Sequence, residues 1–212
     1  MLSTKRLFQG RRTFIHKSAL IDKSVSIWEN SKIRENVIIG PSTTIGRNVY
    51  VGPGVIIGQN VKIQNNALIY EPAVIGNNTF IGPSVILTND KFPRSTNKHG
   101  QPKTKEDWTR VGVTVMEGCS ISAGTVCIAP IILGAWSMTG AGAVVTKDVP
   151  AHALVLGNPA RFSHWIGKLG EKLVEKYPGI YISPLTLEEY ELIDTKLGLK
   201  SRNSAKKNRS KR

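Results

Sequence analysis

Two polar side chains with the capacity for chemistry stand where an otherwise regular chain breaks its pattern, and a third lies 18 residues earlier. Asn89 and Asp90 follow directly on Leu87 and Thr88, and Glu71 lies 18 positions before Asn89. Carboxylate and amide oxygens accept hydrogen bonds from hydroxyl and amine groups, so these side chains could bind and orient a polar substrate. They can act together only if the fold brings positions 18 residues apart into contact.

The elements that must position them follow a period of six residues. An aliphatic residue recurs every six positions from Ile15 to Leu87, which gives thirteen consecutive matches. A small or β-branched residue stands two positions before each match, and glycine often follows it, as at Gly40. The period resumes in a new phase at Val115 and continues to Val145. Six fits neither the 3.6-residue period of a helix nor hairpin strands with turns every 8–12 residues.

This repeat predicts an all-β solenoid in which each hexapeptide is one short strand and one corner. The aliphatic residue and the residue two before it point inward, and the following glycine supplies the backbone angles of the corner. Three hexapeptides form one triangular coil, so the nineteen repeats give slightly more than six coils. Neighbouring coils pair as parallel strands about 4.8 Å apart. Glu71 and Asn89 then stack at one corner in adjacent coils.

Residues 13–160 resemble the left-handed parallel β-helix of the hexapeptide-repeat acyltransferases. The resemblance implies that fold and a homotrimer with active sites between subunits. Carbonic anhydrase-like β-helices are the alternative without acyl transfer, and they need a histidine cluster for zinc. The four histidines form no pair with ligand spacing, so no metal is expected; they are His16, His99, His152 and His164.

The segment GAGAVVTKDVPAHALVLGNPAR, residues 140–161, resembles the end of the coil in acetyl-CoA-dependent members of that family. The resemblance implies that Lys147 and Arg161 contact the phosphates of acetyl-CoA, a role that a lysine and an arginine suit. The alternative is that NPAR is only a turn that leaves the coil. The backbone expected to meet the pantetheine amides is that of Gly140, Ala141, Gly142 and Ala143.

The break itself predicts a functional loop over residues 88–110. Leu87 and Val115 are 28 residues apart, and the polar segment between them is expected to leave the coil. Loops on a rigid scaffold often carry function, although a tolerated insertion is the alternative.

Glu71, TNDKFPRS at residues 88–95 and NPAR together resemble the sugar-nucleotide 3-N-acetyltransferases. These enzymes acetylate the C-3 amine of a nucleotide-linked amino sugar for bacterial surface glycans such as the O-antigen of lipopolysaccharide. The resemblance favours a dTDP-3-amino-3,6-dideoxyhexose as the acceptor, with UDP-2-acetamido-3-amino-glucuronate as the alternative. A sugar O-acetyltransferase and a scaffold β-helix whose basic ends bind nucleic acid or membrane also stay open.

Acetyl transfer to an amine requires a neutral amine held near the thioester carbonyl and donors aimed at the developing oxyanion. The resemblance implies that Asn89 and Asp90 orient the amino sugar, that Glu71 contacts a hydroxyl or the amine, and that no histidine acts as the base. His99 lies in the loop and is expected to be exposed. A sugar hydroxyl normally needs a base, which argues against O-acetylation. The further substrate-binding candidates are Tyr70 and Arg94.

We expect the β-helix to occupy residues 1–157 and a helical segment to occupy 158–197. One amphipathic helix is predicted from Ala160 to Lys176 and a second short helix over residues 185–197. The first helix would cover the open edge of the last coil. The apolar residues that recur at helical spacing are Trp165, Ile166, Leu169, Leu173 and Val174.

Most of the net charge of +14 belongs to the two ends of the chain. Residues 1–17 and 196–212 hold thirteen lysines and arginines and no acid, whereas 18–195 hold 16 basic and 15 acidic residues. The region 198–212 is therefore expected to be a disordered, solvated tail without a specific nucleic-acid partner. No apolar run is long enough for a transmembrane helix, and no secretory signal is apparent. Cys119 and Cys127 are expected to be reduced core thiols in a cytoplasmic protein.

Overall fold

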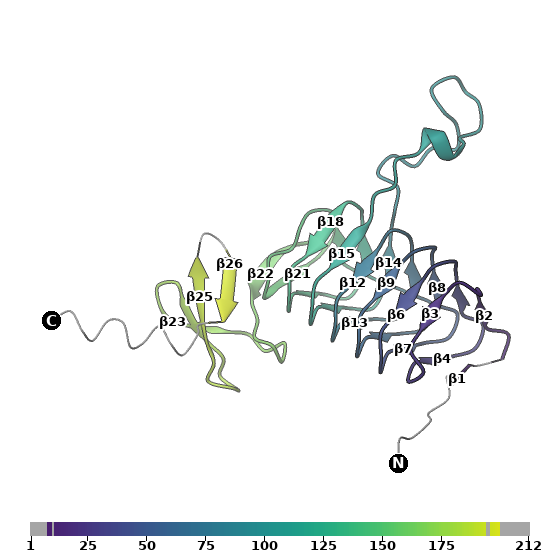
Figure 1. Cartoon of the computed structure of the whole chain (residues 1–212). Helices are drawn as coiled ribbons and strands as arrows, with labels where there is room; N and C mark the ends of the chain where they lie inside the picture. The colour runs from purple at the N-terminus through teal and green to yellow at the C-terminus, as the bar shows by residue number, and fades with distance from the viewer. Residues whose placement is uncertain (1–7, 10, 194–195, 200–212) are drawn as a thin grey trace, which may run out of the picture.

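The chain forms a long three-sided solenoid followed by a small antiparallel sheet (Figure 1). The structure is a computed structural model that describes residues 8–9, 11–193 and 196–199. From β1 to β17 each strand pairs in parallel with the strand numbered three higher, which produces three faces. The nineteen strands from β2 to β20 correspond to the nineteen predicted repeats. The β-helix is thus confirmed, while its left hand stays a prediction.

The bounds of the strands show how uniform the coil is. The first face comprises β1 (Phe8–Gln9), β4 (Ser26–Ile27), β7 (Thr44–Ile45), β10 (Lys62–Ile63), β13 (Phe80–Ile81), β16 (Ser120–Ile121), β19 (Met138–Thr139), β21 (Ala153–Leu156) and β22 (Arg161–Trp165). The second face comprises β2 (Phe14–Ile15), β5 (Lys32–Ile33), β8 (Tyr50–Val51), β11 (Leu68–Ile69), β14 (Ile86–Leu87), β17 (Val126–Cys127) and β20 (Val144–Val145). The third face comprises β3 (Leu20–Ile21), β6 (Ile38–Ile39), β9 (Ile56–Ile57), β12 (Val74–Ile75), β15 (Val113–Val115) and β18 (Ile131–Leu133).

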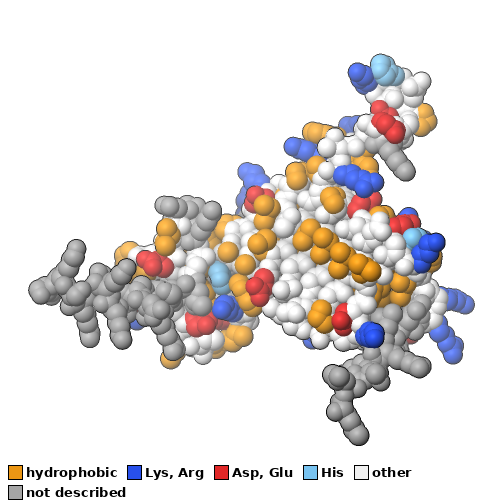
Figure 2. Space-filling model, viewed as in Figure 1, with side chains coloured by type: hydrophobic (Ala, Val, Ile, Leu, Met, Phe, Trp, Pro, Cys, Tyr) orange, Lys and Arg blue, Asp and Glu red, His pale blue; other side chains and the backbone are white. Residues whose placement is uncertain are grey.

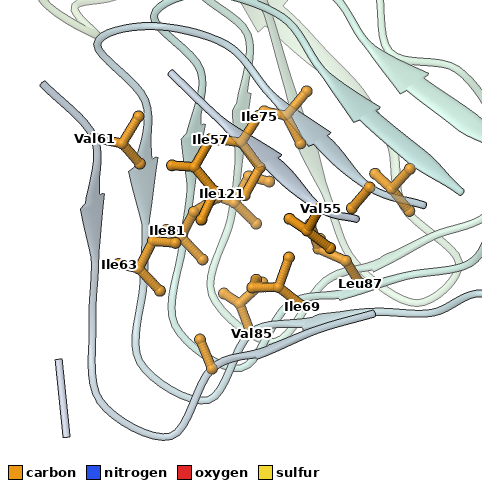
Figure 3. Close-up of a cluster of buried hydrophobic side chains, with 14 of the residues drawn as sticks. Val55, Ile57, Val61, Ile63, Ile69, Ile75, Ile81, Val85, Leu87 and Ile121 are labelled. Atoms are coloured by element: carbon orange, nitrogen blue, oxygen red, sulfur yellow. The ribbon is translucent and has the colours of Figure 1, made fainter. Parts of the chain in front are cut away.

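The core is a column of stacked aliphatic side chains inside the coil (Figure 3). Ile63, Ile69 and Ile75 come from the three faces of one coil and are each no more than 1% exposed. Each packs over its equivalent in the next coil, so the repeat stabilises itself layer by layer. The two cysteines occupy the same kind of inward position and are buried and unpaired, as predicted.

The glycines that follow the inward aliphatic residues have a different role from the predicted one. The positive φ angles of the corners belong to residues two positions further on, such as Asn48 and Gly54. Gly40 instead has the backbone of Gly58 in the next coil against it, so close that a β-carbon would lie 2.8 Å from the Gly58 carbonyl carbon. These glycines are needed because adjacent coils approach closely, not because the corner requires unusual angles.

The predicted carboxyl-terminal helices are wrong, because the segment after β21 folds as β-strands. β22 pairs antiparallel with β21, and β23 (Val174–Tyr177), β24 (Ile180–Ile182), β25 (Glu189–Ile193) and β26 (Lys196–Leu199) form a four-stranded antiparallel sheet. Gly170 has φ of +86°, which no α-helix allows, and Pro178-Gly179 turns β23 into β24. The open edge of the last coil is covered as expected, but by a strand that completes its hydrogen bonds.

That sheet has a small core of its own, made of Leu173, Tyr190 and Leu197. The predicted tail at 198–212 falls largely outside the described residues, since β26 ends at Leu199. A single 3₁₀ turn, η1 (Lys105–Asp107), interrupts the long segment between β14 and β15. Among the described residues no helix is long and apolar enough to span a membrane.

The outer surface of the third face carries a row of exposed aliphatic side chains. Leu20 pairs with Ile38, Ile38 with Ile56 and Ile56 with Val74 along adjacent strands, and all four are between 39% and 66% exposed. Figure 2 shows this row as a band of hydrophobic atoms over β3, β6, β9 and β12. An exposed apolar band of this kind is typical of an interface with another protein surface.

Candidate active site

The candidate site lies on the corner between the second and third faces, here called the second corner. β11 and β14 are in register with Leu68 opposite Ile86 and Ile69 opposite Leu87. The Tyr70 backbone N–H donates to the Leu87 carbonyl at 3.2 Å, which continues that register beyond the strands. The Glu71 backbone therefore lies one coil before that of Asn89 on the same corner, as the 18-residue spacing predicted.

The side chain of Glu71 extends toward the preceding coil rather than toward Asn89. A β-carbon at Gly52 would overlap its Oε2 atom. This oxygen is buried and has no hydrogen-bond partner among the described residues. A buried acceptor without a hydrogen-bond donor lowers the stability of the folded state. The unpaired carboxylate oxygen of Glu71 therefore calls for an explanation.

Tyr70 belongs to a row of polar side chains that continues along the second corner. Its ring lies 5.3 Å from that of Tyr50, and the Tyr50 hydroxyl accepts a hydrogen bond from Arg34 at 3.4 Å. Glu35 holds Arg34 through two hydrogen bonds of 2.9 and 3.0 Å. Burial, followed by the nearby Glu71 carboxylate, raises the pKa of Tyr50.

Sequence reasoning missed Arg34 and Tyr50 as parts of this row. The 18-residue spacing of the coil could have identified Arg34, because Arg34 lies 36 positions, or two coils, before Tyr70. Tyr50 is harder to find, since it is an outward residue of a strand and not a corner residue.

The Asp90 side chain stabilises the turn at the start of the loop. Its Oδ1 accepts a hydrogen bond from the Phe92 backbone N–H at 2.8 Å. Thr88 anchors the same point, because its Oγ1 accepts from the Ala129 N–H of the following coil at 3.0 Å. Asn89 lies between them and is partly buried. The return of the loop is close by, since Gly112 packs tightly against Pro72.

The predicted loop is an arm that projects well clear of the solenoid (Figure 1). It covers residues 88–112, and a bridge between Thr96 and Pro102 together with a 2.8 Å hydrogen bond from Asn97 N–H to Gln101 O holds its outer part as a hairpin. Arg94 is exposed on this arm and donates to the Pro93 carbonyl at 3.1 Å. His99 is exposed at the outer part of the arm, as expected. Within one chain the arm extends away from the solenoid (Figure 1).

Lys147 and Arg161 are brought together at the far end of the coil. Both line one pocket of about 250 Å³, whose walls include Val155 and Phe162. The pocket also contains Asp148, whose Oδ1 accepts from the Ile132 N–H at 2.8 Å. Two cations in the lining of one pocket can bind phosphate groups, and the contact of Lys147 and Arg161 with acetyl-CoA stays a prediction.

The Gly140–Ala143 turn lies at the opposite edge of the second face from Lys147. β20 separates them, with Ala143 before its first residue and Lys147 two positions after its last. Ala141 and Gly142 are exposed, and Gly142 has φ of +70°. In one chain this backbone therefore does not share a corner with Lys147.

No group of three or more histidine, cysteine, aspartate or glutamate side chains gathers into a metal-binding cluster among the described residues. His16 lies on the second corner but three coils before Tyr70, which is roughly 14 Å along the axis at the usual strand spacing. His152 is buried at the end of the coil, where its Nδ1 lies 3.1 Å from the Ile166 carbonyl. Burial lowers the pKa of His152.

Comparison with known proteins finds one matching family model and several curated relatives. The family described as the GMPPB C-terminal domain matches residues 15–93. The dTDP-3-amino-3,6-dideoxy-alpha-D-galactopyranose 3-N-acetyltransferase of Aneurinibacillus thermoaerophilus is 46% identical over 59 residues, which is 28% of this chain and 31% of that protein. Serine acetyltransferase 2 of Arabidopsis thaliana is 44% identical over 45 residues, 21% of this chain and 14% of that protein. The matches thus span less than a third of either relative.

Solved structures resemble the fold over a larger share of the chain. The polySia-specific acetyltransferase NeuO has a TM-score of 0.55 at 16% identity, over 81% of this chain and 84% of that one. A hexapeptide transferase family protein of Anaplasma phagocytophilum has a TM-score of 0.50 at 20% identity, over 74% and 81%.

The six-residue period and the three-sided parallel coil define a hexapeptide-repeat β-helix protein. The sequence matches, which cover only part of each relative, show similarity of this β-helix to acetyltransferases.

Proposed function

We propose that this protein is an acetyl-CoA-dependent N-acetyltransferase that acts on the C-3 amine of a nucleotide-linked amino sugar, with a dTDP-3-amino-3,6-dideoxyhexose as the preferred acceptor. The observation that carries the proposal is the second corner. There Glu71, with an unpaired buried oxygen, lies one coil before Asn89 and Asp90, at the base of the arm. The relative from Aneurinibacillus thermoaerophilus, whose name states this acceptor class, supports the choice.

The residues of the corner suit an amine acceptor. Asn89 and Glu71 offer oxygens that accept hydrogen bonds from a sugar amine or hydroxyl, and Asp90 adds a negative charge at the same point. Acetyl-CoA supplies the acetyl group as a thioester. The amine nitrogen forms the new bond to the carbonyl carbon as the carbon–sulfur bond breaks, and the proton lost by the amine goes to the leaving thiolate. Holding the two reactants in this geometry accounts for much of the expected rate enhancement.

A homotrimer with sites between subunits is part of the proposal. The aliphatic row on the third face, from Leu20 to Val74, supports an apolar contact with a second copy. The separation of Gly140–Ala143 from Lys147 supports a cofactor groove shared between copies, in which one chain provides the turn and another the cations. The arm would reach across such a groove.

Steady-state kinetics with acetyl-CoA and a dTDP-3-amino sugar test the proposal. We expect Glu71→Ala and Asp90→Ala to lower kcat/KM by roughly 100-fold, as misplaced reactants commonly do. His99→Ala is the control and should leave kcat/KM unchanged, whereas a thousandfold loss would reinstate a histidine base. If Glu71→Ala and Asp90→Ala both retain the wild-type kcat/KM, the second corner takes no part in the mechanism.

The acceptor class is tested by thermal shift with acetyl-CoA, dTDP-sugars and UDP-sugars in parallel. Stabilisation by dTDP-sugars supports the preferred acceptor, and stabilisation by UDP-sugars alone would move the assignment to the amino-glucuronate. Acetylation of a sugar hydroxyl but not of an amine would contradict the N-acetyltransferase assignment. A protein that binds no acetyl-CoA, and whose binding to DNA collapses with salt, would instead be a scaffold.

A further inference from the structure

A repeated hydrogen bond links the corners of neighbouring coils. The Arg47 backbone N–H donates to the Asn65 side-chain oxygen at 2.8 Å, and the Gln59 N–H donates to the Asn77 side-chain oxygen at 3.0 Å. In both pairs the residues are 18 positions apart and the accepting oxygen lies over the glycine that precedes the donor, Gly46 or Gly58. The arrangement is therefore a regular device of this coil.

Glu71 occupies the same structural position in its own corner. Its Oε2 lies over Gly52, and the residue 18 positions earlier is Pro53. The main chain is equivalent at the three sites, since the residue after the strand is a glycine in each and the backbone nitrogen of Asn65, Glu71 or Asn77 lies 2.8 to 2.9 Å from where that glycine's β-carbon would be.

Pro53 has no backbone N–H, so the expected donor is missing at this one site. That absence explains why Glu71 Oε2 is buried without a hydrogen-bond partner in the described part of the chain, while Asn65 and Asn77 are paired. The carboxylate is held in place by the shape of the Gly52-Pro53 corner but is not neutralised by it.

We propose that Pro53 is a positioning residue that keeps the Glu71 carboxylate unpaired so that its full acceptor strength is directed at the acceptor substrate. The inference rests on the proposed function. The two oxygens of a carboxylate share one negative charge, and a hydrogen bond to one oxygen weakens the other as an acceptor. An N–H at position 53 would therefore compete with the amine or hydroxyl of the amino sugar for the same charge.

Pro53→Ala supplies the missing donor with little change in shape. We expect kcat/KM for the amino sugar to fall about tenfold, with the KM for acetyl-CoA unchanged, because only the acceptor meets Glu71. Gln59→Ala is the matched control: it changes the side chain at the equivalent corner, retains the N–H and should leave both constants unchanged. In a Glu71→Ala background, Pro53→Ala should have no further effect on kcat/KM.

Thermal unfolding of the wild type, Pro53→Ala, Glu71→Ala and the variant with both substitutions reports the new hydrogen bond independently of catalysis. Loss of proline also increases the freedom of the unfolded chain, so the Tm change is compared between backgrounds. The Tm change caused by Pro53→Ala should be more favourable by several degrees when Glu71 is present than when it is alanine.

Three outcomes would overturn the positioning role of Pro53 alone. Wild-type kcat/KM in Pro53→Ala would show that the missing donor does not matter, and an equal loss in the Glu71→Ala background would show that Pro53 acts by another route. Equal Tm changes in the two backgrounds would show that no hydrogen bond forms. An inactive wild type would overturn the proposed function itself, and the positioning role with it, which distinguishes that failure from the others.

Discussion

The carboxylate of Asp90 accepts a hydrogen bond from the backbone N–H of Phe92 at 2.8 Å. This contact closes the turn by which the chain leaves the coil, so a side chain that we place at the acceptor site also builds the base of the arm. Loss of activity on removing Asp90 would therefore have two explanations, which a graded substitution separates.

Asp90→Asn keeps the oxygen that closes the turn and removes the negative charge. We expect its Tm to equal that of the wild type and its kcat/KM to fall roughly tenfold, since a charge-assisted hydrogen bond is about twice as strong as a neutral one. Asn97→Ala is the matched control, because Asn97 closes a similar turn in the outer part of the arm through the His99 N–H at 3.0 Å. If Asp90→Asn is fully active and Asp90→Ala is not, Asp90 acts only through the turn.

Lys147→Ala and Arg161→Ala should each raise the KM for acetyl-CoA by roughly tenfold with little change in kcat, because each removes a charged contact to phosphate. Acetyl-dephospho-CoA, which lacks the 3′-phosphate, identifies the group that is contacted: a variant that loses that phosphate contact should show the same KM for both donors. Lys62→Ala, on the exposed surface of the first face, serves as the control. Unchanged KM values in both variants would remove the shared pocket from the cofactor site.

The aliphatic row of the third face should hold the proposed trimer together. Ile56 is 44% exposed there, and Phe80 is 38% exposed on the first face, so the two provide a matched pair. Ile56→Lys should shift the protein to a lower mass in sedimentation velocity, since an apolar contact cannot accept an unpaired ammonium. Phe80→Lys should leave the mass unchanged. A monomeric wild type, or dissociation by Phe80→Lys alone, would contradict this assignment.

The buried thiol of Cys127 should make stability fall at alkaline pH. Burial raises the pKa of Cys127 from its ordinary value of 9.0 to about 12. The unfolded chain then loses its proton first, so the free energy of unfolding is intact below about pH 9 and decreases by about 1.4 kcal/mol per pH unit toward pH 12.

Urea unfolding at pH 8, 9, 10 and 11 measures this slope. Cys127→Ala should be less stable throughout, because it leaves a cavity, but should lose less stability as the pH rises. An equal slope in the variant would show that the Cys127 thiol does not titrate in the unfolding transition. Cys119, whose pKa burial also raises, provides a second site for the same comparison.

The coil could be predicted from the sequence residue by residue because its contacts are nearly one-dimensional. Each inward residue, such as Ile63 or Ile81, packs on the residue one coil away, so a regular period implies a regular register. The same logic placed Glu71 one coil before Asn89. It gave the wrong reason for the glycines that follow the inward residues, since the close approach of Gly40 to Gly58 depends on the spacing between coils.

The carboxyl-terminal region shows where a local pattern was insufficient. Trp165, Ile166 and Leu169 have helical spacing, yet β21 presents an unpaired edge and β22 fills it. Pairing with that edge satisfies backbone groups that a helix would leave open. Gly167 and Gly170 in the same stretch weaken a helix further.

Taken alone, the sequence determined the hexapeptide coil, the break at residue 88 and the corner shared by Glu71 and Asn89, because a period of six sets all three. Tertiary structure decided the rest: the direction of the Glu71 side chain, its unpaired oxygen opposite Pro53, the Asp90 turn and the antiparallel sheet after β21. Those features depend on which groups meet across neighbouring coils and at the open edge of the last coil. The missing hydrogen bond between position 53 and Glu71 can be recognised only once the fold has brought the two residues together.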